Sequence, residues 1–526
     1  MSVERRNDMQ NKKIEKMWIA DLGDGTYRNP ILYTDYSDPD AIRVGEDFFM
    51  VASSFSNVPS VPLLHSRDLV NWKVVNYIME KLPFERYDKP AHGCGAWAPA
   101  IRYHEGVYYV FIPFPDEGIL MCRTEDPFGR WSEPVCVKGN AGWIDPCPFW
   151  DEDGKAYLVN GFARSRIGFK SALYISPLSE DATTIPGNGE DGRFVYDGHA
   201  TQPTIEGPKL YKRNGYYYIF APAGGVKTGW QTVLRSRHIY GPYEEKIVMR
   251  QGNSPVNGPH QGAWVDTPDG EDWFLHFQDV GNAGRIVHLQ PMKWVDDWPV
   301  IGVDEDGDGC GEPVLRYRKP SVGEGKAQLP DAPEDSDFFE GDRLGLQWQW
   351  NANDRQEWYS LQDNYLSLYA RKKELGLPLC DVPNLLLQKW PAPEFSVTVH
   401  LRLEAMRDGD VCGMISLGER YDSVLVCQRN GRKFLQQRTG RISLREESKV
   451  DLGDLDRDIL CLRMKVEKAD RISWEAGSGE DMLRPIGKST QASPGVWVGV
   501  KSGLLAVHEG EGECGRMDVE DFIYIK

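Results

Sequence analysis

The sequence predicts an all-β protein with two domains, a five-bladed β-propeller followed by a jelly-roll-like β-sandwich. Three observations predict this fold. One motif, ending in an aromatic strand, recurs five times before residue 300. In the same region short strands alternate with Gly, Pro and Asn turns, without a long stretch of helical periodicity. After residue 338 short alternating strands continue without that motif, which favours a second all-β domain of the sandwich type.

The recurring motif consists of a lead residue, an apolar residue four positions later, a turn glycine and then aromatic residues. In its fourth copy Asn214-Gly215 precedes the aromatic run at 216–220, a strong signal for a hairpin. Successive lead residues are 59, 48, 61 and 54 positions apart, and a period near 50 is typical of propeller blades. Equivalent positions in a propeller face the central axis. We therefore expect five lead residues to converge there: Asp38, Trp97, Asp145, Glu206 and His260.

The chain divides into four predicted segments. Residues 1–17 are charged and expected to be frayed, and residues 18–302 form the propeller. An acidic, Gly/Pro-rich connector covers 303–337, and the sandwich covers 338–526. Within the connector, Asp304, Asp306, Asp308 and Gly309 match the start of a calcium loop. Leu315 stands where that loop needs a glutamate, so an acidic turn is the preferred interpretation.

Bulk properties exclude several classes of partner. The net charge of −18 over 526 residues argues against nucleic acid and anionic membranes, since no basic excess can replace their counterions. The sequence holds no apolar run long enough for a membrane span, and its first residues do not resemble an export signal. Its ten cysteines lack paired spacing, as expected for reduced thiols in the cytoplasm. A neutral ligand such as a carbohydrate suits the many Trp and Tyr residues.

Three of the five lead residues are carboxylic acids, which suggests glycosidic-bond hydrolysis. That reaction needs one carboxyl group to protonate the leaving oxygen and another to attack or to activate water. A third can raise the pKa of the acid. Taken singly, Asp38, Asp145 and Glu206 could be turn residues, His260 a structural histidine and Trp97 a core residue. Turns do not require acids at equivalent places in three blades, so the set as a whole favours an active site.

The motifs around these acids resemble glycoside hydrolase family 43, whose fold is a five-bladed propeller carrying inverting exo-glycosidases. The likeness covers roughly residues 28–302. It rests on Tyr36-Ser37-Asp38-Pro39, on Ile144-Asp145-Pro146-Cys147-Pro148-Phe149 and on Glu206-Gly207-Pro208-Lys209-Leu210-Tyr211. The resemblance implies that Asp38 is the general base, Asp145 the group that modulates the pKa, and Glu206 the general acid. The region after 335 is similar to the accessory sandwich of the xylosidase and arabinofuranosidase branch.

The resemblance also implies a set of substrate-binding residues. Phe55 and Trp97 match positions that wall the sugar pocket, and Arg285 matches an arginine that binds sugar hydroxyls. His260 resembles a central histidine that contacts calcium through water in some members; no cofactor is needed for the chemistry itself. Two departures stand out: Asp40 occupies a position where a small residue is common, and the histidine lies in the unusual sequence Gly258-Pro259-His260-Gln261.

The leading functional hypothesis is an exo-acting, inverting enzyme that releases terminal α-L-arabinofuranose, and also β-D-xylose, from xylan- or arabinan-derived oligosaccharides. Alternatives are a β-xylosidase as the main activity, an endo-arabinanase and a non-catalytic sugar-binding propeller. A retaining furanosidase is disfavoured because its Asn-Asp-Pro-Asn motif is missing from the sequence. The substrate is then the only predicted partner, and the sequence does not indicate an oligomeric state.

Overall fold

The computed structural model describes residues 15–323 and 328–526. They form two compact units. One comprises Ala20–Pro330 together with Val496–Val498, and the other comprises the described residues before Ala20, Asp331–Gly495 and Gly499–Lys526. Strands dominate both units. The helices found among the described residues are short, and none has the length and apolar character needed to cross a membrane. They are η1 (Glu85–Asp88), α2 (Arg164–Ile167), η2 (Pro186–Gly189), η3 (Gly281–Ala283), η4 (Gln356–Trp358), η5 (Leu379–Asp381) and η6 (Glu480–Met482).

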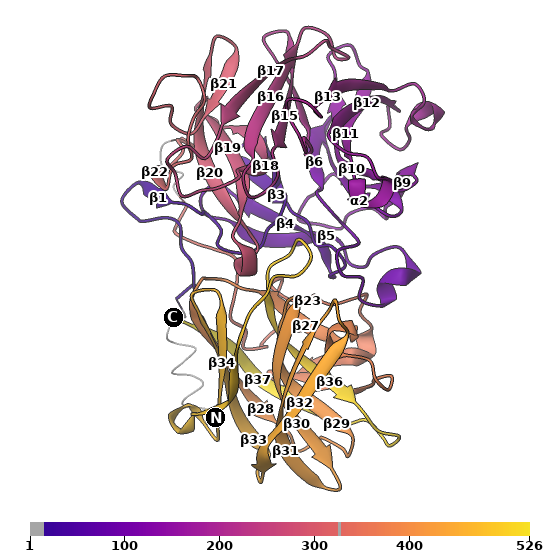
Figure 1. The fold of residues 1–526 in the computed structure, drawn as a ribbon, viewed down its shortest axis with the longest axis vertical. Coiled ribbons are helices and arrows are strands. Elements are labelled where there is room, and N and C mark those ends of the chain that lie inside the picture. Colours follow the sequence, from indigo (N-terminus) through magenta and orange to yellow (C-terminus); the bar gives the residue numbers. More distant parts are fainter. Residues whose placement is uncertain (1–14, 324–327) are drawn as a thin grey trace. The chain divides into compact units, whose positions relative to one another are not determined.

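The first unit is a five-bladed propeller, as predicted, with each blade a four-stranded antiparallel sheet paired in chain order (Figure 1). Blade 1 contains β2 (Asp40–Val44), β3 (Asp47–Val51), β4 (Ser60–Ser66) and β5 (Lys73–Met79). Blade 2 contains β6 (Ala100–His104), β7 (Val107–Phe114), β8 (Gly118–Thr124) and β9 (Val135–Gly139). Blade 3 contains β10 (Trp143–Trp150), β11 (Ala156–Phe162), β12 (Ala172–Leu178) and β13 (Arg193–Asp197). Blade 4 contains β14 (Lys209–Arg213), β15 (Tyr216–Ala223), β16 (Trp230–Ser236) and β17 (Glu244–Met249), and blade 5 contains β18 (His260–Asp266), β19 (Asp272–Asp279), β20 (Arg285–Val295) and β21 (Trp298–Ile301).

The repeated motif corresponds to the first hairpin of each blade. Every lead residue lies just before the first strand of its blade or within the first three residues of that strand. The five turn glycines between first and second strands all have positive φ, from 64° to 85°. Only glycine adopts this left-handed backbone without a steric cost, which explains its recurrence in the motif. These are Gly45, Gly106, Gly154, Gly215 and Gly270.

Apolar side chains hold neighbouring blades together. Between blades 1 and 5, for example, Phe48, Met50 and Leu275 are fully buried in one cluster. The segment before blade 1 closes the ring: Leu32 and Val287 exchange backbone hydrogen bonds of 3.3 and 3.0 Å. Farther out, β1 (Thr26–Arg28) pairs with β22 (Arg316–Arg318), so residues after blade 5 also join this closure.

The acidic segment after blade 5 forms a turn that satisfies its own backbone. Asp304 accepts hydrogen bonds from the amides of Gly307 (2.8 Å) and Gly309 (3.0 Å), and Asp308 accepts one from Cys310 (2.8 Å). Asp308 also pairs with Arg250. The carboxylates of Asp304, Asp306 and Asp308 can approach within 4.8 Å of one another. Their hydrogen bonds are those of an acidic turn.

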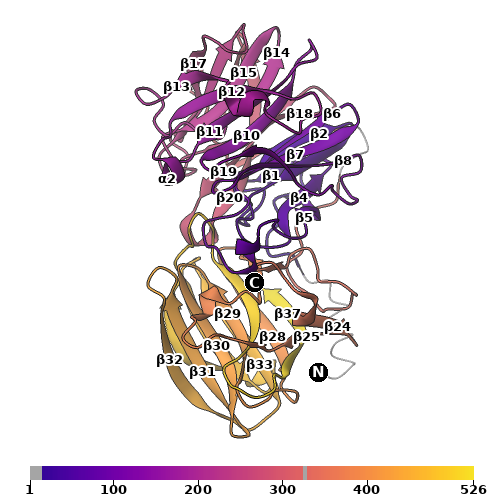
Figure 2. The ribbon, with the colours of Figure 1, turned by 90° about the vertical axis from the view of Figure 1, so that its right-hand side faces the viewer.

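The second unit is a β-sandwich with a concanavalin-like fold, again as predicted (Figure 2). One sheet has the order β23-β27-β36-β29-β30-β31-β32, with β26 beside β36, and the other has the order β24-β25-β37-β28-β33-β34-β35. The strands of the first are β23 (Gln349–Trp350), β26 (Arg371–Lys372), β27 (Leu385–Lys389), β29 (Asp410–Leu417), β30 (Arg420–Arg429), β31 (Arg432–Arg441), β32 (Glu446–Leu455) and β36 (Lys501–His508). Those of the second are β24 (Tyr359–Gln362), β25 (Tyr365–Tyr369), β28 (Phe395–Arg402), β33 (Ile459–Glu467), β34 (Arg471–Gly477), β35 (Arg484–Gln491) and β37 (Arg516–Ile525).

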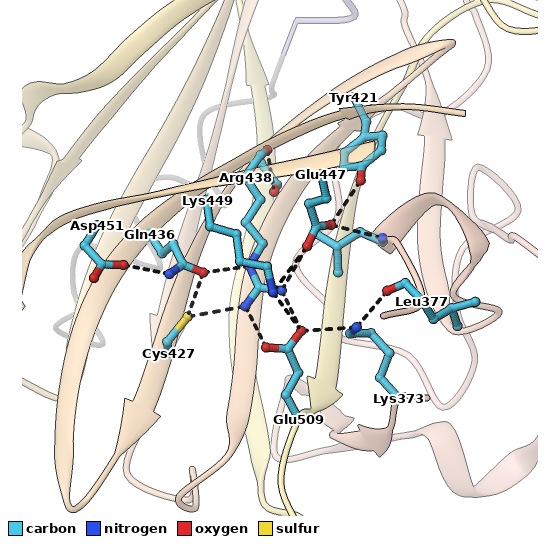
Figure 3. Close-up of polar contacts among 12 residues, drawn as sticks. Lys373, Leu377, Tyr421, Cys427, Gln436, Arg438, Glu447, Lys449, Asp451 and Glu509 are labelled. Carbon is cyan, nitrogen blue, oxygen red and sulfur yellow. Dashed lines mark hydrogen bonds and ion pairs between the residues drawn. The ribbon is translucent and has the colours of Figure 1, made fainter. Parts of the chain in front are cut away.

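A buried ion-pair network lies on the first sheet of the sandwich (Figure 3). The guanidinium of Arg438, fully buried, donates to both carboxylate oxygens of Glu509 at 2.7 and 3.0 Å. Burial alone would raise the pKa of Glu509, but the hydrogen bond and charge of Arg438, with the charges of Lys449 and Lys373, lower it to about 2. Glu447 accepts from the Tyr421 hydroxyl at 3.0 Å. These polar groups satisfy one another as hydrogen-bond and ion-pair partners.

Candidate active site

The propeller brings Asp38, Asp145, Glu206 and His260 together at its centre. The backbone amide of Gly207 donates to Asp145 Oδ2 at 2.8 Å, and His260 Nε2 is hydrogen-bonded to Glu206 Oε1 at 2.8 Å. A Cβ built on Gly161 would lie 3.7 Å from Asp145 Oδ2 and 3.8 Å from the Glu206 Cα. The charges of Glu206 and Asp38 both act on the Asp145 carboxyl. Four of the five lead residues expected to converge are therefore neighbours in the fold.

Three donors hold the carboxylate of Asp38 in place. The hydroxyls of Ser37 and Ser53 donate to Oδ2 at 2.7 and 2.6 Å, and Arg285 Nη1 donates to Oδ1 at 2.9 Å. The residue is 5% exposed. Hydrogen bonds between a guanidinium and a carboxylate are short and directional, so these contacts fix the orientation of the Asp38 carboxylate.

Arg285 is anchored from two sides. Its backbone amide donates to Asp35 Oδ1 at 2.8 Å, and its Nη1 also donates to Ser37 Oγ at 2.9 Å. The Nη1 atom of Arg285 contacts the Asp38 carboxylate and Ser37, and the binding of sugar hydroxyls that the resemblance implies for Arg285 stays a prediction. Its Nε, buried, has no hydrogen-bond partner among the described residues and remains a donor for a ligand. Ser37 belongs to the quoted Tyr36-Ser37-Asp38-Pro39 motif, whereas the sequence analysis assigned no role to Ser53.

Asp38 and Asp145 share an unusual backbone conformation. Asp38 and Asp145 have φ values of 57° and 54°, in the left-handed region, which Asp tolerates better than most residues. The pairing of β10 with β11 shifts register between Ile144 and Cys147, a bulge at Asp145. Such bulges redirect side chains near functional sites. Phe55, a bulky residue with φ of 53°, is a stronger outlier, as expected where a pocket constrains the chain.

Asp145 carries the largest electrostatic perturbation among these carboxylates. Burial raises its pKa, the negative charges of Glu206 and, to a lesser degree, Asp38 raise it further, and the bond from Gly207 opposes them; the result is a pKa of about 7. The side chain is 2% exposed. A carboxyl group with such a pKa keeps a proton at the site up to neutral pH. Perturbed pKa values of this kind are typical of catalytic centres.

Replacing Asp145 by asparagine should stabilise the fold at alkaline pH while impairing activity. The folded-state pKa of Asp145 lies above its ordinary value of 3.8, so the folded state binds this proton more tightly than the unfolded chain. The wild-type free energy of unfolding therefore loses on the order of 4 kcal/mol from this group as pH rises from about 4 to about 7. Asparagine does not ionise, so the free energy of unfolding of the variant has no such loss with rising pH. Chemical unfolding at pH 5 and pH 8 should show a stability gain that is larger at pH 8; an equal difference at both pH values would contradict it.

Phe55 and Trp97, the two aromatic residues predicted to wall the sugar pocket, lie next to each other. Phe55 and Ala96 form an isolated bridge, with backbone hydrogen bonds of 2.9 and 3.0 Å, and the Phe55 and Trp97 ring centroids are 6.3 Å apart. The Arg166 guanidinium, from α2, lies 4.8 Å from the Trp97 ring centroid. Phe55 is 5% exposed. The two residues predicted to wall a pocket are therefore neighbours, and Arg166 is an addition that the sequence did not indicate.

Four buried polar atoms attached to this site have no hydrogen-bond partner among the described residues. They are Trp97 Nε1, His260 Nδ1, Gln261 Oε1 and Arg285 Nε. An unsatisfied buried polar atom costs about 1–3 kcal/mol, so several in one place call for a ligand or ordered water. Three of the four residues are those singled out from the sequence. A polyhydroxylated, uncharged ligand matches such a mixture of donors and acceptors.

A belt of polar contacts, absent from the sequence-based predictions, joins the blades next to the acids. Buried Asp40 accepts from Arg102 Nη1 at 2.7 Å, and Arg102 Nη2 donates to Cys147 Sγ at 2.9 Å. Cys147 Sγ also accepts from the Leu210 amide at 3.3 Å. These contacts cross blades 1 to 4. Asp40 and Cys147 follow Asp38 and Asp145 by two residues, so the belt holds the strands that carry both catalytic candidates.

His260 is a hydrogen-bonding partner of Glu206 through its Nε2 atom. In the described parts of the chain, the one group of three side chains close enough to share a metal ion lies in the acidic turn and does not contain His260. The water-mediated calcium contact that the resemblance implies for His260 stays a prediction.

A propeller with three interacting carboxylates, an aromatic wall and unsatisfied donors at its centre is built for carbohydrate hydrolysis. Comparison with known proteins agrees. The model of "Glycosyl hydrolases family 43" matches residues 27–299, and that of the "Beta xylosidase C-terminal Concanavalin A-like domain" matches 336–525. The chain therefore belongs to glycosyl hydrolase family 43 and is a glycoside hydrolase.

Its relatives include enzymes for two sugars. A putative β-xylosidase of Xylanibacter ruminicola is 39% identical over 93% of this chain and 88% of that protein. A β-xylosidase of Formosa agariphila is 36% identical over 70% of this chain and 66% of that protein. A non-reducing end α-L-arabinofuranosidase of Bacteroides ovatus is 27% identical over 79% of both chains. Among solved structures, the GH43 protein BlXynB of Bacillus licheniformis superposes with a TM-score of 0.80, at 26% identity, over 95% of this chain and 99% of that one.

Proposed function

We propose that the protein is an exo-acting β-xylosidase that inverts anomeric configuration. This revises the order of the hypotheses drawn from the sequence, where arabinofuranose release came first and β-xylosidase activity was the alternative. The relatives of higher identity carry β-xylosidase names, and the arabinofuranosidase is more distant. Arabinofuranose release is then a secondary activity of the same pocket.

The observation that carries the proposal is the unequal environment of the three central carboxylates. Asp38 is bound by two hydroxyls and a guanidinium, Asp145 is buried with a pKa of about 7, and Glu206 is 25% exposed with His260 as its partner. Groups in environments that differ this much suit different roles in acid–base catalysis. A binding protein gains nothing from burying like charges together.

The proposed reaction is a single displacement. Asp38 takes a proton from water as the water oxygen attacks the anomeric carbon, and Glu206 gives a proton to the glycosidic oxygen as the bond to the leaving sugar breaks. Arg285 holds the Asp38 carboxylate in position through its Nη1 contact. Asp145 lies beside Glu206 and accepts a hydrogen bond from the Gly207 amide, which positions the segment that carries the acid. One water molecule is consumed, and the released sugar has the opposite configuration.

Side-by-side assays test this function. On 4-nitrophenyl β-D-xylopyranoside and 4-nitrophenyl α-L-arabinofuranoside we expect kcat/KM to favour the xyloside by roughly tenfold or more, since pocket shape discriminates on this scale. NMR of the first product from the xyloside should show α-xylose before mutarotation. A preference for the arabinoside would make arabinofuranose release the main activity, as first expected from the sequence. First-formed β-xylose would make Asp38 a nucleophile, and no activity on either glycoside would favour a sugar-binding propeller or an endo-acting enzyme.

We also propose that the enzyme acts on oligosaccharides inside the cell. All ten cysteines are free, and six of them are fully buried. Free thiols suit a reducing compartment. Fractionation of the native host, with the protein followed by antibody, tests this location.

A further inference from the structure

An aromatic cluster on blade 3 is unexplained by the reaction at the propeller axis. It comprises Trp143, Phe162, Phe169, Tyr174 and Phe194. Phe194 is the hub: its ring centroid lies 4.9 Å from Tyr174, 5.8 Å from Phe162 and 6.0 Å from Phe169. Yet Phe194 is 61% exposed, on the outermost strand of the blade. Because the Phe194 ring packs on the cluster and is still largely exposed, it offers an apolar face to a ligand.

The cluster is continuous with the active site. Phe169 precedes Lys170 and Ser171, which bind the segment leading into Glu206: Lys170 Nζ donates to Thr204 Oγ1 at 3.0 Å, and the Thr204 amide donates to Ser171 Oγ at 2.9 Å. Phe162 follows Gly161, which adjoins Asp145 and Glu206. The intervening helix α2 brings Arg166 onto Trp97. One stretch of chain, 161–171, therefore connects the acid, the pocket wall and the aromatic cluster.

The position of Glu206 indicates which part of a substrate reaches this cluster. The general acid must lie within hydrogen-bond reach of the leaving oxygen, so the leaving sugar lies on the Glu206 side of the scissile bond. Gly161 of blade 3 adjoins Glu206. Phe194 is three strands outward from β10, a span of about 14 Å at the usual strand spacing. A leaving group of one sugar ends before that distance, whereas a longer chain extends over it.

We infer that the blade 3 aromatic cluster, with Phe194 and Phe169 at its surface, binds the reducing-end sugars of longer xylo-oligosaccharides. This inference rests on the proposed function and adds a remote subsite to it. Polar groups suited to sugar hydroxyls surround the rings: His199 is an exposed neighbour 5.7 Å from Phe169, and it pairs with Asp197. Neutral sugar rings need apolar stacking faces with a polar rim, and this patch provides both.

The chain-length dependence of hydrolysis tests this subsite. Phe194→Ala should lower kcat/KM for xylotetraose by about tenfold, equivalent to about 1.4 kcal/mol, while kcat/KM for 4-nitrophenyl β-D-xylopyranoside and xylobiose stays within about twofold. Phe194→Tyr should retain the wild-type ratio, because a ring is restored. Phe128→Ala is the matched control: Phe128 is 53% exposed and packs on the rings of Phe49 and His65, but it lies in a turn of blade 2 away from Glu206. That control should leave the chain-length ratio unchanged.

Three outcomes would overturn the inference. An unchanged xylotetraose-to-aryl-xyloside ratio in Phe194→Ala would show that the patch does not bind substrate. An equal loss on the aryl xyloside would indicate a structural defect, which thermal unfolding of the variant would identify. If Phe194→Asp instead changed the mass measured by light scattering, with an unaltered ratio, the patch would be a contact between copies of the chain. Failure of the proposed function itself looks different, because wild-type protein would then not cleave the aryl xyloside.

Discussion

Replacing Asp38 by alanine should abolish turnover on every substrate, with kcat reduced by about 10⁴-fold. A general base typically contributes up to this amount, and the described site holds no second carboxylate with the same set of donors that could activate the water. The loss should not depend on the leaving group, because water activation is required for all glycosides. Steady-state kinetics on 4-nitrophenyl β-D-xylopyranoside and on xylobiose measure both quantities.

The Asp38→Ala variant needs a folding control, because it leaves the buried Arg285 guanidinium without its partner carboxylate. Removing one member of a buried ion pair typically costs about 3–5 kcal/mol of stability. Asp38→Asn keeps the shape of the side chain, and Ser53→Ala removes a single hydrogen bond to Asp38 while leaving the carboxylate. Asp38→Asn should be as inactive as the alanine variant, and Ser53→Ala should retain most activity. Folded Asp38→Asn with activity within tenfold of wild type would remove Asp38 from the role of base.

Replacing Glu206 by glutamine should produce a loss that depends on the leaving group. 4-Nitrophenolate leaves without much protonation, so kcat/KM on the aryl xyloside should fall by only about tenfold. The sugar alkoxide of xylobiose needs a proton, and the loss there should be about 10³–10⁴-fold. A series of aryl xylosides with leaving groups of increasing pKa should give a steeper slope for the variant than for the wild type.

The pH dependence of kcat/KM is a second test of the role of Glu206, with the same Glu206→Gln variant. Glutamine cannot donate the proton, so the alkaline limb of kcat/KM on the aryl xyloside should flatten. His260 is the hydrogen-bonding partner of Glu206, and glutamine retains a carbonyl oxygen for that contact. Equal losses on xylobiose and on the aryl xyloside would assign the proton transfer to another group. Asp145, with its pKa of about 7, is then the next candidate.

The aromatic cluster of blade 3 gives the enzyme a second source of selectivity. The proposed axial chemistry handles a terminal sugar whatever follows it, whereas Phe194 contacts only substrates long enough to reach it. Binding energy gained far from the scissile bond changes the preference for chain length without altering the chemical step on short substrates. The Phe194 variants therefore test recognition of chain length at the blade 3 cluster separately from recognition of the terminal sugar at the propeller axis.

Substrate preference is where prediction from the sequence was least successful. The motifs around Asp38, Asp145 and Glu206 indicate the family and its reaction, and they are shared by enzymes that act on arabinose and on xylose. The residues predicted to form the sugar pocket, Phe55, Trp97 and Arg285, come from distant parts of the propeller sequence. The shape formed by their side chains is not encoded in any single motif. The proposal that β-xylosidase activity exceeds arabinofuranosidase activity therefore rests on the relatives and not on the residue pattern.

The residue pattern was enough to predict the number of blades, the phase of the repeat and the convergence of Asp38, Asp145 and Glu206. It could do so because strand alternation, turn glycines and Asn-Gly hairpins are local signals, and a radial repeat converts equal position in the motif into nearness in space. The tertiary structure alone decided the contacts between distant residues. Among these are the bond from Arg285 to Asp38, the belt through Asp40, Arg102 and Cys147, and the buried Arg438 network of the sandwich. Each joins residues far apart in the chain, and their geometry and charges depend on how blades or strands pack, which local periodicity does not specify.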